Sequence, residues 1–283
     1  MAATTKYEIV RLMVGKDVQE NLDRPRRPLN GVAMTLNRLS RGQMVRDVSL
    51  TLHKGEILGI AGLVGSGRTE LLRLIFGADR FDQGEIHLAG SALPKGHSPV
   101  DAVKAGIGLV TEDRKAQGLL LSQSIRVNTT LANLGDVSSR SWLQTAKEMN
   151  IVNRMRNLLG IRSQSIEQTT GELSGGNQQK VVFARWIHRN CDILLLDEPT
   201  RGVDIGARAD IYQEMDNMAA SGKALLMVSS DLRELMTVCD RIAVMSAGKL
   251  VTIVERGQWS QQGLLEAAFS EYSSVQVTEH ASR

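Results

Sequence analysis

The sequence predicts an α/β fold built on a mostly parallel sheet, and three observations support this prediction. A strand-like run at residues 57–60 passes through a glycine-rich turn into a helical pattern at residues 69–76. Residues 192–200 contain consecutive apolar residues without alternation, as buried central strands of parallel sheets do. Two further apolar strands, at residues 224–230 and 241–245, flank a helical segment. Strands that alternate with helices are typical of an α/β domain.

The remaining elements follow in chain order. Residues 48–52 alternate between apolar and polar side chains, as a half-buried strand does. We expect further strands at residues 85–88 and 107–110, with a helix at 100–105 between them. Strand signals are absent from residues 119–172, where helical patterns such as 146–159 predict a helical insertion. A last helix is expected at residues 259–270, followed from Ser273 by a polar tail that we expect to be frayed.

The composition is that of a globular protein. Apolar residues make up 42% of the 283 residues, which allows a core in one large domain or two small ones. The 34 basic and 31 acidic residues give a formal charge of +3, which is too balanced to indicate nucleic acid as a partner. No apolar run approaches the roughly 18 residues of a membrane helix. The start has no hydrophobic signal core, so we expect no export. Cys191 and Cys239 have no metal-ligand spacing and are expected to be buried free thiols.

Residues 1–31 do not begin a domain cleanly. Residues 7–14 form a short helical pattern, and the stretch from Asp17 to Pro28 carries the prolines and charges of a linker. We interpret its basic cluster, residues 24–27, as part of a solvated linker rather than as a binding patch.

Residues 62–69 fit a phosphate-binding loop. The pattern G-x-x-x-x-G-K-[ST] is met at Gly62, Gly67 and Thr69, with Arg68 in the lysine position. The glycines let the backbone turn tightly and direct its N–H groups at one anion, and the following helix adds its positive dipole end. The alternative is a plain glycine turn between a strand and a helix, which the motifs further along the chain argue against.

Two motifs in the second half carry further chemistry. The run Leu-Ser-Gly-Gly-Asn-Gln-Gln-Lys at residues 173–180 opens a helix, with Ser174 as a good N-cap, and fits a second anion site or only a helix cap. The buried strand ends in Asp197, which can hold Mg²⁺, and Glu198, which can orient or deprotonate an attacking water. The charged cluster at residues 111–115 also follows a strand end, where ligands bind in parallel sheets.

Together these motifs resemble the ATP-binding cassette of an ABC transporter over about residues 32–258. More narrowly, GSGRTE, TEDRK, LSGGNQQK and DEPTRGVD resemble the second cassette of bacterial sugar importers of the ribose, galactose and xylose type, which carry two cassettes on one polypeptide. The resemblance implies a P-loop NTPase (RecA-like) core with a mixed sheet, plus an ABC-type helical subdomain at about residues 119–172. It also implies that residues 1–31 are the tail of a preceding cassette with its linker, and that residues 259–283 are a C-terminal helix and polar tail. We therefore expect the chain to be the C-terminal half of such a protein or the product of a truncated gene.

The resemblance also implies ATP and Mg²⁺ as cofactors and assigns roles by position. The phosphates would be cradled by the loop residues Gly62, Gly65, Ser66, Gly67, Arg68 and Thr69. The metal would be held by Thr69 and Asp197, with Glu198 as the catalytic carboxylate. The signature, represented by Ser174, Gly175, Gly176 and Gln178, would reach across a dimer to the ATP of another cassette. Asp204 would belong to the loop that couples the two sites.

Departures from the family pattern gather in this chain's own nucleotide site. Glu112 stands where many cassettes have a glutamine that senses Mg²⁺ and the membrane subunit, and Ser230 stands where many have a histidine that contacts the γ-phosphate. Residues 30–45 offer no aromatic to stack on adenine. Arginine is larger and planar, so Arg68 does not replace a lysine conservatively. We therefore expect nucleotide binding with slow turnover, and an intact signature that completes the site of a partner cassette.

The function implied is an ATPase subunit that couples ATP hydrolysis to sugar import. Its partners would be a second cassette, an integral membrane permease and, indirectly, a periplasmic sugar-binding protein, with the chain peripheral on the cytoplasmic face of the bacterial inner membrane. A soluble cassette ATPase acting on DNA or ribosomes is a second hypothesis, but the long coiled coil or basic extension usual in such chains is missing. A nucleotide-binding regulatory module is a third, favoured by Arg68 and Ser230 but opposed by Glu198.

Overall fold

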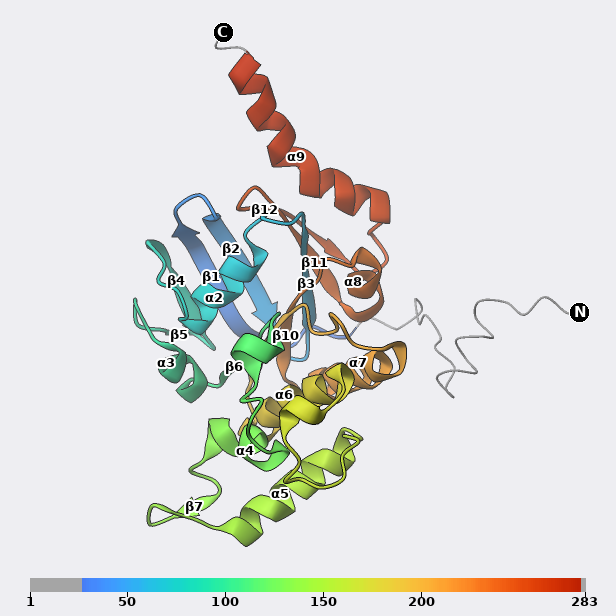
Figure 1. Cartoon of the computed structure of the whole chain (residues 1–283). Helices are drawn as coiled ribbons and strands as arrows, with labels where there is room; N and C mark the ends of the chain where they lie inside the picture. Colours follow the sequence, from blue (N-terminus) through green and yellow to red (C-terminus); the bar gives the residue numbers. More distant parts are fainter. Residues whose placement is uncertain (1–26, 281–283) are drawn as a thin grey trace, which may run out of the picture.

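The computed structural model describes residues 27–280, with a six-stranded mixed sheet at its centre (Figure 1). The strand order is β12-β11-β3-β10-β9-β6. Five of these strands are parallel, and only β12 runs antiparallel to its neighbour. Their bounds are β3 (Ile57–Gly62), β6 (Ile107–Val110), β9 (Ile193–Asp197), β10 (Ala224–Val228), β11 (Arg241–Ser246) and β12 (Lys249–Glu255). The predicted α/β fold with a mixed sheet is therefore confirmed.

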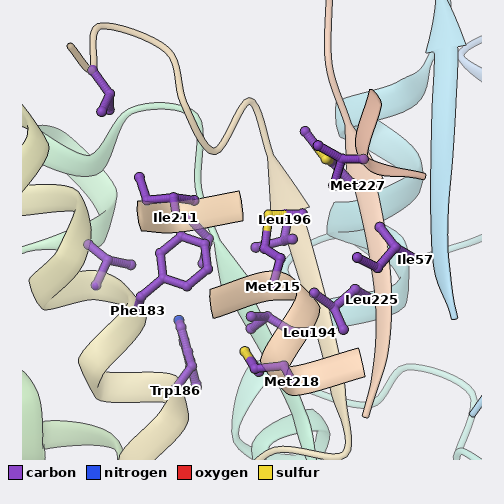
Figure 2. Close-up of a cluster of buried hydrophobic side chains, with 14 of the residues drawn as sticks. Ile57, Phe183, Trp186, Leu194, Leu196, Ile211, Met215, Met218, Leu225 and Met227 are labelled. Atoms are coloured by element: carbon purple, nitrogen blue, oxygen red, sulfur yellow. The ribbon is translucent and has the colours of Figure 1, made fainter. Parts of the chain in front are cut away.

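Both faces of this sheet are buried, which explains why its strands read as continuous apolar runs. Leu194 and Leu196 of β9 join one core, while the alternate residues Ile193 and Leu195 join the other. Figure 2 shows the first core, in which Phe183 and Trp186 pack toward the sheet beside Ile211, Met215 and Met218. These side chains come from the helices α6 (Gly175–Arg189) and α7 (Ile205–Ala220).

The second core lies between the other face of the central sheet and a four-stranded antiparallel sheet of order β2-β1-β4-β5. Its strands are β1 (Val32–Arg41), β2 (Val45–His53), β4 (Gln83–Leu88) and β5 (Ser91–Ala92). The helix α2 (Arg68–Phe76) contributes Leu71, Leu72 and Ile75 to this core. Burial on this side fixes α2 directly after β3, so the loop between them is supported at both ends.

The expected helical insertion forms a separate layer against α6 and includes one feature that the sequence analysis missed. Its main helices are α4 (Ile125–Thr130) and α5 (Thr145–Leu158). Arg126 pairs with Glu148 and Glu167, which ties these helices to the returning chain. Between α4 and α5 a short hairpin, β7 (Ser138–Ser139) and β8 (Trp142–Leu143), contradicts the expectation of no strands. Its strands are two residues long, too short to show a period of two in the sequence.

The ends of the described chain also differ from expectation. The helix α9 (Gln261–His280) continues past residue 270, so residues 273–280 are helical rather than frayed. Figure 1 shows α9 extending from the body beside β11 and β12, and the Ser246 hydroxyl donates a 2.7 Å hydrogen bond to the Ala268 carbonyl. Arg27 is not solvated as expected, because it pairs with Asp216 and Asp240. The expected helix at residues 7–14 and most of the expected linker lie outside the described residues.

Two further helices agree with the sequence. The helix α3 (Pro99–Lys104) begins with a capping box between Ser98 and Asp101, and α8 (Leu232–Val238) links β10 to β11. Cys191 and Cys239 are buried free thiols, as expected. Within residues 27–280, no helix has the length and apolarity needed to cross a membrane.

Candidate functional site

The candidate phosphate loop joins β3 to α2 and requires glycine at Gly67. Gly67 has a φ of 95°, and a Cβ there would lie 1.9 Å from the Met44 carbonyl oxygen. The helix begins at the next residue, so the first N–H groups of α2 have no carbonyl of the preceding turn to bond. Val64, at the tip of the loop, is 92% exposed. The loop therefore presents backbone donors and a helix N-terminus toward solvent, as an anion site needs.

The end of β9 brings Asp197 to the start of α2. The Thr69 hydroxyl donates a 3.2 Å hydrogen bond to the Asp197 carboxylate. Asp197 is buried, and burial raises its pKa to about 6, helped by the neighbouring charge of Glu198. The contacts with Thr69 and Arg68 oppose this rise. A buried carboxylate that costs this much to ionise is suited to a site where a cation binds.

Glu198 follows Asp197 with a left-handed backbone, φ 47°, which turns it out of the line of β9. Its N–H donates to the Val228 carbonyl at 3.0 Å, and its carboxylate accepts a 3.2 Å hydrogen bond from the Ser230 hydroxyl. Burial raises the pKa of Glu198, while the bond from Ser230 and the charge of Arg68 lower it. The structure thus brings Glu198 and Ser230 together.

Arg68 reaches across the same site. It is buried, and its Nη1 donates a 2.8 Å hydrogen bond to the carbonyl of Ser229, just past the end of β10. Burial lowers the pKa of its guanidinium, and the charges of Glu198 and Asp197 oppose that shift. A cavity of about 450 Å³ is lined by residues that include Gly62 and Ser230. Arg68, itself part of the candidate phosphate loop, therefore lies near both carboxylates.

Glu234 organises the same strand ends, and the sequence analysis missed it. Its buried carboxylate accepts hydrogen bonds from the hydroxyls of Thr200 at 2.5 Å, Tyr212 at 2.9 Å and Ser229. These three donors come from the turn after β9, from α7 and from the end of β10. Only its position beside the apolar residues of α8 could have hinted at burial, because a lone glutamate in a helix usually faces solvent.

The signature residues lie at the start of α6 and form no bond with the candidate phosphate loop. Ser174 does not cap the helix with its side chain as expected. Its hydroxyl accepts a 2.9 Å hydrogen bond from the Asn177 side chain rather than from a backbone N–H. Gly176 packs so closely that a Cβ would lie 2.7 Å from Ala207. Gln178 is buried, and its side-chain amide donates a 3.1 Å hydrogen bond to the Thr170 carbonyl. Among residues 27–280, no hydrogen bond or ion pair joins residues 174–178 to residues 62–69.

Two further expected residues lie at the turn that follows β9. Asp204 caps α7, and its carboxylate accepts a 2.9 Å hydrogen bond from the Ala207 N–H. Glu112 forms an ion pair with Arg201, and both line a cavity of about 470 Å³. In the described part of the chain, Glu112 makes no hydrogen bond or ion pair with Thr69 or Asp197.

The described residues suit a magnesium ion whose coordination shell is completed by a bound ligand. They hold no group of three or more His, Cys, Asp or Glu side chains that could cage a metal. The hydroxyl of Thr69 and the carboxylate of Asp197 are adjacent oxygen donors. Mg²⁺ is commonly held by one or two such groups with phosphate oxygens and water in its remaining positions. The donor set therefore fits Mg²⁺ bound together with a phosphate ligand.

Curated proteins similar to this chain are bacterial import ATP-binding proteins. It is 42% identical to the putative ribose/galactose/methyl galactoside import ATP-binding protein 1 of Rhizobium meliloti, over 95% of this chain and 54% of the relative. It is 45% identical to the ribose import ATP-binding protein RbsA 3 of the same organism, over 91% of this chain and 51% of the relative. The chain thus spans about half the length of these relatives.

Solved structures confirm the fold, and a family comparison gives the membership. A nucleotide-free ATP-binding cassette from an ABC transporter matches with a TM-score of 0.69 and 21% identity, over 84% of this chain and 95% of that one. A dimeric bacterial ABC transporter cassette matches with a TM-score of 0.69 and 20% identity, over 80% and 100%. The ABC transporter family model matches residues 45–201. The chain therefore belongs to the ABC transporter family.

Proposed function

We propose that this chain binds Mg-ATP at residues 62–69 and couples its binding and hydrolysis to sugar import through a membrane permease. The observation that carries the proposal is that two residues of the candidate phosphate loop, Thr69 and Arg68, lie close to Asp197. Backbone donors, a cation and a carboxylate with a raised pKa suit a magnesium–triphosphate ligand. Family membership supports the use of a nucleotide.

In the proposed reaction the chain's own residues position the phosphates and the attacking water. The N–H groups of residues 65–69 and the Arg68 guanidinium bind phosphate oxygens. Thr69 and Asp197 would hold Mg²⁺, which would supply positive charge beside the transferred group. Glu198 accepts a proton from, or orients, a water aligned with the γ-phosphate, and Ser230 holds that carboxylate. Arg68 in place of lysine and Ser230 in place of histidine make turnover slow in this site, below about 1 s⁻¹ for the isolated chain.

The signature serves a second cassette. Ser174, Gly175 and Gly176 begin a 15-residue helix, so their N–H groups and the helix dipole suit a γ-phosphate brought by a partner. Their lack of bonds to residues 62–69 supports action in trans. One solved cassette of this fold is described as dimeric. Stabilisation of the phosphate would then arise only when two cassettes close on each other.

The import role rests on the curated relatives, which are named as ribose or galactose import ATP-binding proteins. In this role residues 32–258 form the cassette and residues 112–115 belong to the face that meets the permease. A periplasmic sugar-binding protein delivers the sugar to that permease, and this chain acts peripherally on the cytoplasmic side.

Affinity purification tests the import role. The tagged full chain is recovered from detergent-solubilised membranes of its host, with and without Mg-ATP, and bound proteins are identified by mass spectrometry. A polytopic permease in stoichiometric amount is expected, and single cysteines at residues 115–125 should cross-link to it. A chain that binds Mg-ATP but recovers no permease would contradict the import role and favour a nucleotide-binding regulatory module, which the contact of Arg68 with Ser229 also fits.

A further inference from the structure

Arg114 joins three segments that the sequence analysis treated as separate motifs. It opens η1 (Arg114–Gly118), a single π-helical turn after β6. Its Nη1 donates a 2.9 Å hydrogen bond to the carbonyl of Arg201, and its Nη2 donates a 3.4 Å hydrogen bond to the carbonyl of Gly202. A Cβ on Gly175, the first residue of the signature helix, would lie 2.6 Å from Nη2 and 2.9 Å from the Gly202 carbonyl. The guanidinium thus lies where η1, the turn at residues 201–203 and the start of α6 meet.

Part of the hydrogen-bonding capacity of this guanidinium is unused. Its Nε is buried without a hydrogen-bond partner, and within residues 27–280 no carboxylate pairs with it. Burial lowers the pKa of Arg114, with only the charge of Asp113 opposing the shift. The N-terminus of α6, against which it packs, carries the positive end of a helix dipole. Two hydrogen bonds to backbone carbonyls hold this cation in place.

The backbone around Arg114 is held firmly. Asp113 accepts hydrogen bonds of 3.0 Å from the N–H groups of both Lys115 and Ala116. A Cβ on Gly118 would lie 3.3 Å from the Arg114 Cβ, so the turn is closely packed. Isolated π-helical turns are rare in proteins.

We propose that Arg114 is a positioning residue that holds the turn at residues 201–203 against the start of the signature helix. Through this contact η1 and the signature change position together. The consequence for hydrolysis rests on the proposed function: displacement of residues 112–118 by a permease would move the N–H groups of the signature relative to the partner's γ-phosphate. Arg114 touches no substrate in this account and acts through the turn and the helix.

Hydrogen exchange of the full chain without nucleotide tests the contact. The probes are the amides of Val203 and Gln178, which donate to the Thr200 and Ser174 carbonyls at 3.1 and 2.9 Å. Arg114→Ala should speed exchange of both at least tenfold, and Arg114→Lys should give an intermediate effect, because lysine cannot donate to two carbonyls as a planar fork. Lys104→Ala, which removes an exposed charge at the end of α3, should match the parent. The amide of Leu225 in the central sheet reports on the whole fold.

Unchanged exchange at Val203 and Gln178 in Arg114→Ala would overturn the proposal, and so would equal acceleration at Leu225, since that shows general destabilisation. A second readout is ATPase activity of the chain assembled with a full first cassette. Arg114→Ala should lower kcat at least tenfold while KM for ATP stays within twofold. If the parental assembly has no ATPase activity, the proposed function fails, but the nucleotide-free exchange result still decides the role of Arg114.

Discussion

Arg68 and Ser229 are joined by a 2.8 Å hydrogen bond from a guanidinium to a carbonyl, which ties the start of α2 to the end of β10. A lysine ends in a single ammonium group, whereas the forked guanidinium can keep this bond and still offer other N–H donors. The same end of β10 leads to Ser230, which bonds Glu198. The residue that departs most from the phosphate-loop pattern is thus connected to the candidate catalytic carboxylate.

Arg68→Ala should weaken Mg-ATP binding at least tenfold. Charge-assisted hydrogen bonds of this kind contribute about 1.5–3 kcal/mol, and alanine leaves no donor for the phosphate. Isothermal titration calorimetry of the full chain measures the change. Arg80→Ala, which removes an exposed arginine just after α2, is the matched control and should bind like the parent. Equal affinity in Arg68→Ala and the parent would show that Arg68 does not bind phosphate.

Asp197→Asn should make the nucleotide-free chain more stable at pH 7.5. The folded-state pKa of about 6 lies above the ordinary value of 3.8, so the folded state favours the protonated carboxyl. The contribution of the Asp197 carboxyl to the free energy of unfolding is fully present below about pH 4, and it is lost as the pH rises through 6. Asparagine cannot ionise and can still accept the Thr69 hydroxyl, so the gain should be about 1–3 kcal/mol at pH 7.5 and near zero at pH 4.

Urea unfolding at the two pH values measures that difference. Asp192→Asn, at an exposed carboxylate just before β9, is the control and should show no such pH dependence. A gain for Asp197→Asn that is the same at both pH values would contradict the raised pKa.

Glu234→Ala should destabilise the chain by about 2–4 kcal/mol. It leaves the hydroxyls of Thr200, Tyr212 and Ser229 without their shared acceptor, and buried unpaired donors are costly. Glu234→Gln keeps one carbonyl oxygen as an acceptor and should therefore lose less stability than Glu234→Ala. Glu85→Ala, at an exposed position, should stay within about 0.5 kcal/mol of the parent. A loss for Glu234→Ala no larger than that of Glu85→Ala in urea unfolding would exclude a structural role for this carboxylate.

The sequence predicted the central elements well because they follow simple periodicities. Buried parallel strands such as β9 and β10 read as apolar runs, and the glycines of the phosphate loop are required by its geometry at Gly67. The pairing of Thr69 with Asp197 follows from topology. Thr69 lies at the start of α2, just after the loop past the carboxyl end of β3, and Asp197 ends β9 in the same parallel sheet.

The features that could not be predicted from the sequence depend on contacts between distant parts of the chain. Glu234 and Arg114 look like solvated charges in the sequence, and only the packing of α7, α8 and the turn after β9 gives them partners. Ser174 looks like a helix cap, but Asn177, one turn later, supplies the donor that its hydroxyl accepts. Local pattern cannot distinguish such cases, because the competing partner decides the outcome.

The central claim is that this chain's signature serves a partner while its own nucleotide site turns over slowly. ATPase activity of the chain assembled with a full first cassette tests both halves together. Ser174→Arg places a bulky cation where the γ-phosphate would be stabilised and should reduce activity by about 10²-fold or more. Glu198→Gln removes only the slow site and should retain more than half of the activity. Ser91→Arg, on the outer sheet, is the control and should behave like the parent. Loss of activity in Glu198→Gln together with full activity in Ser174→Arg would contradict the account.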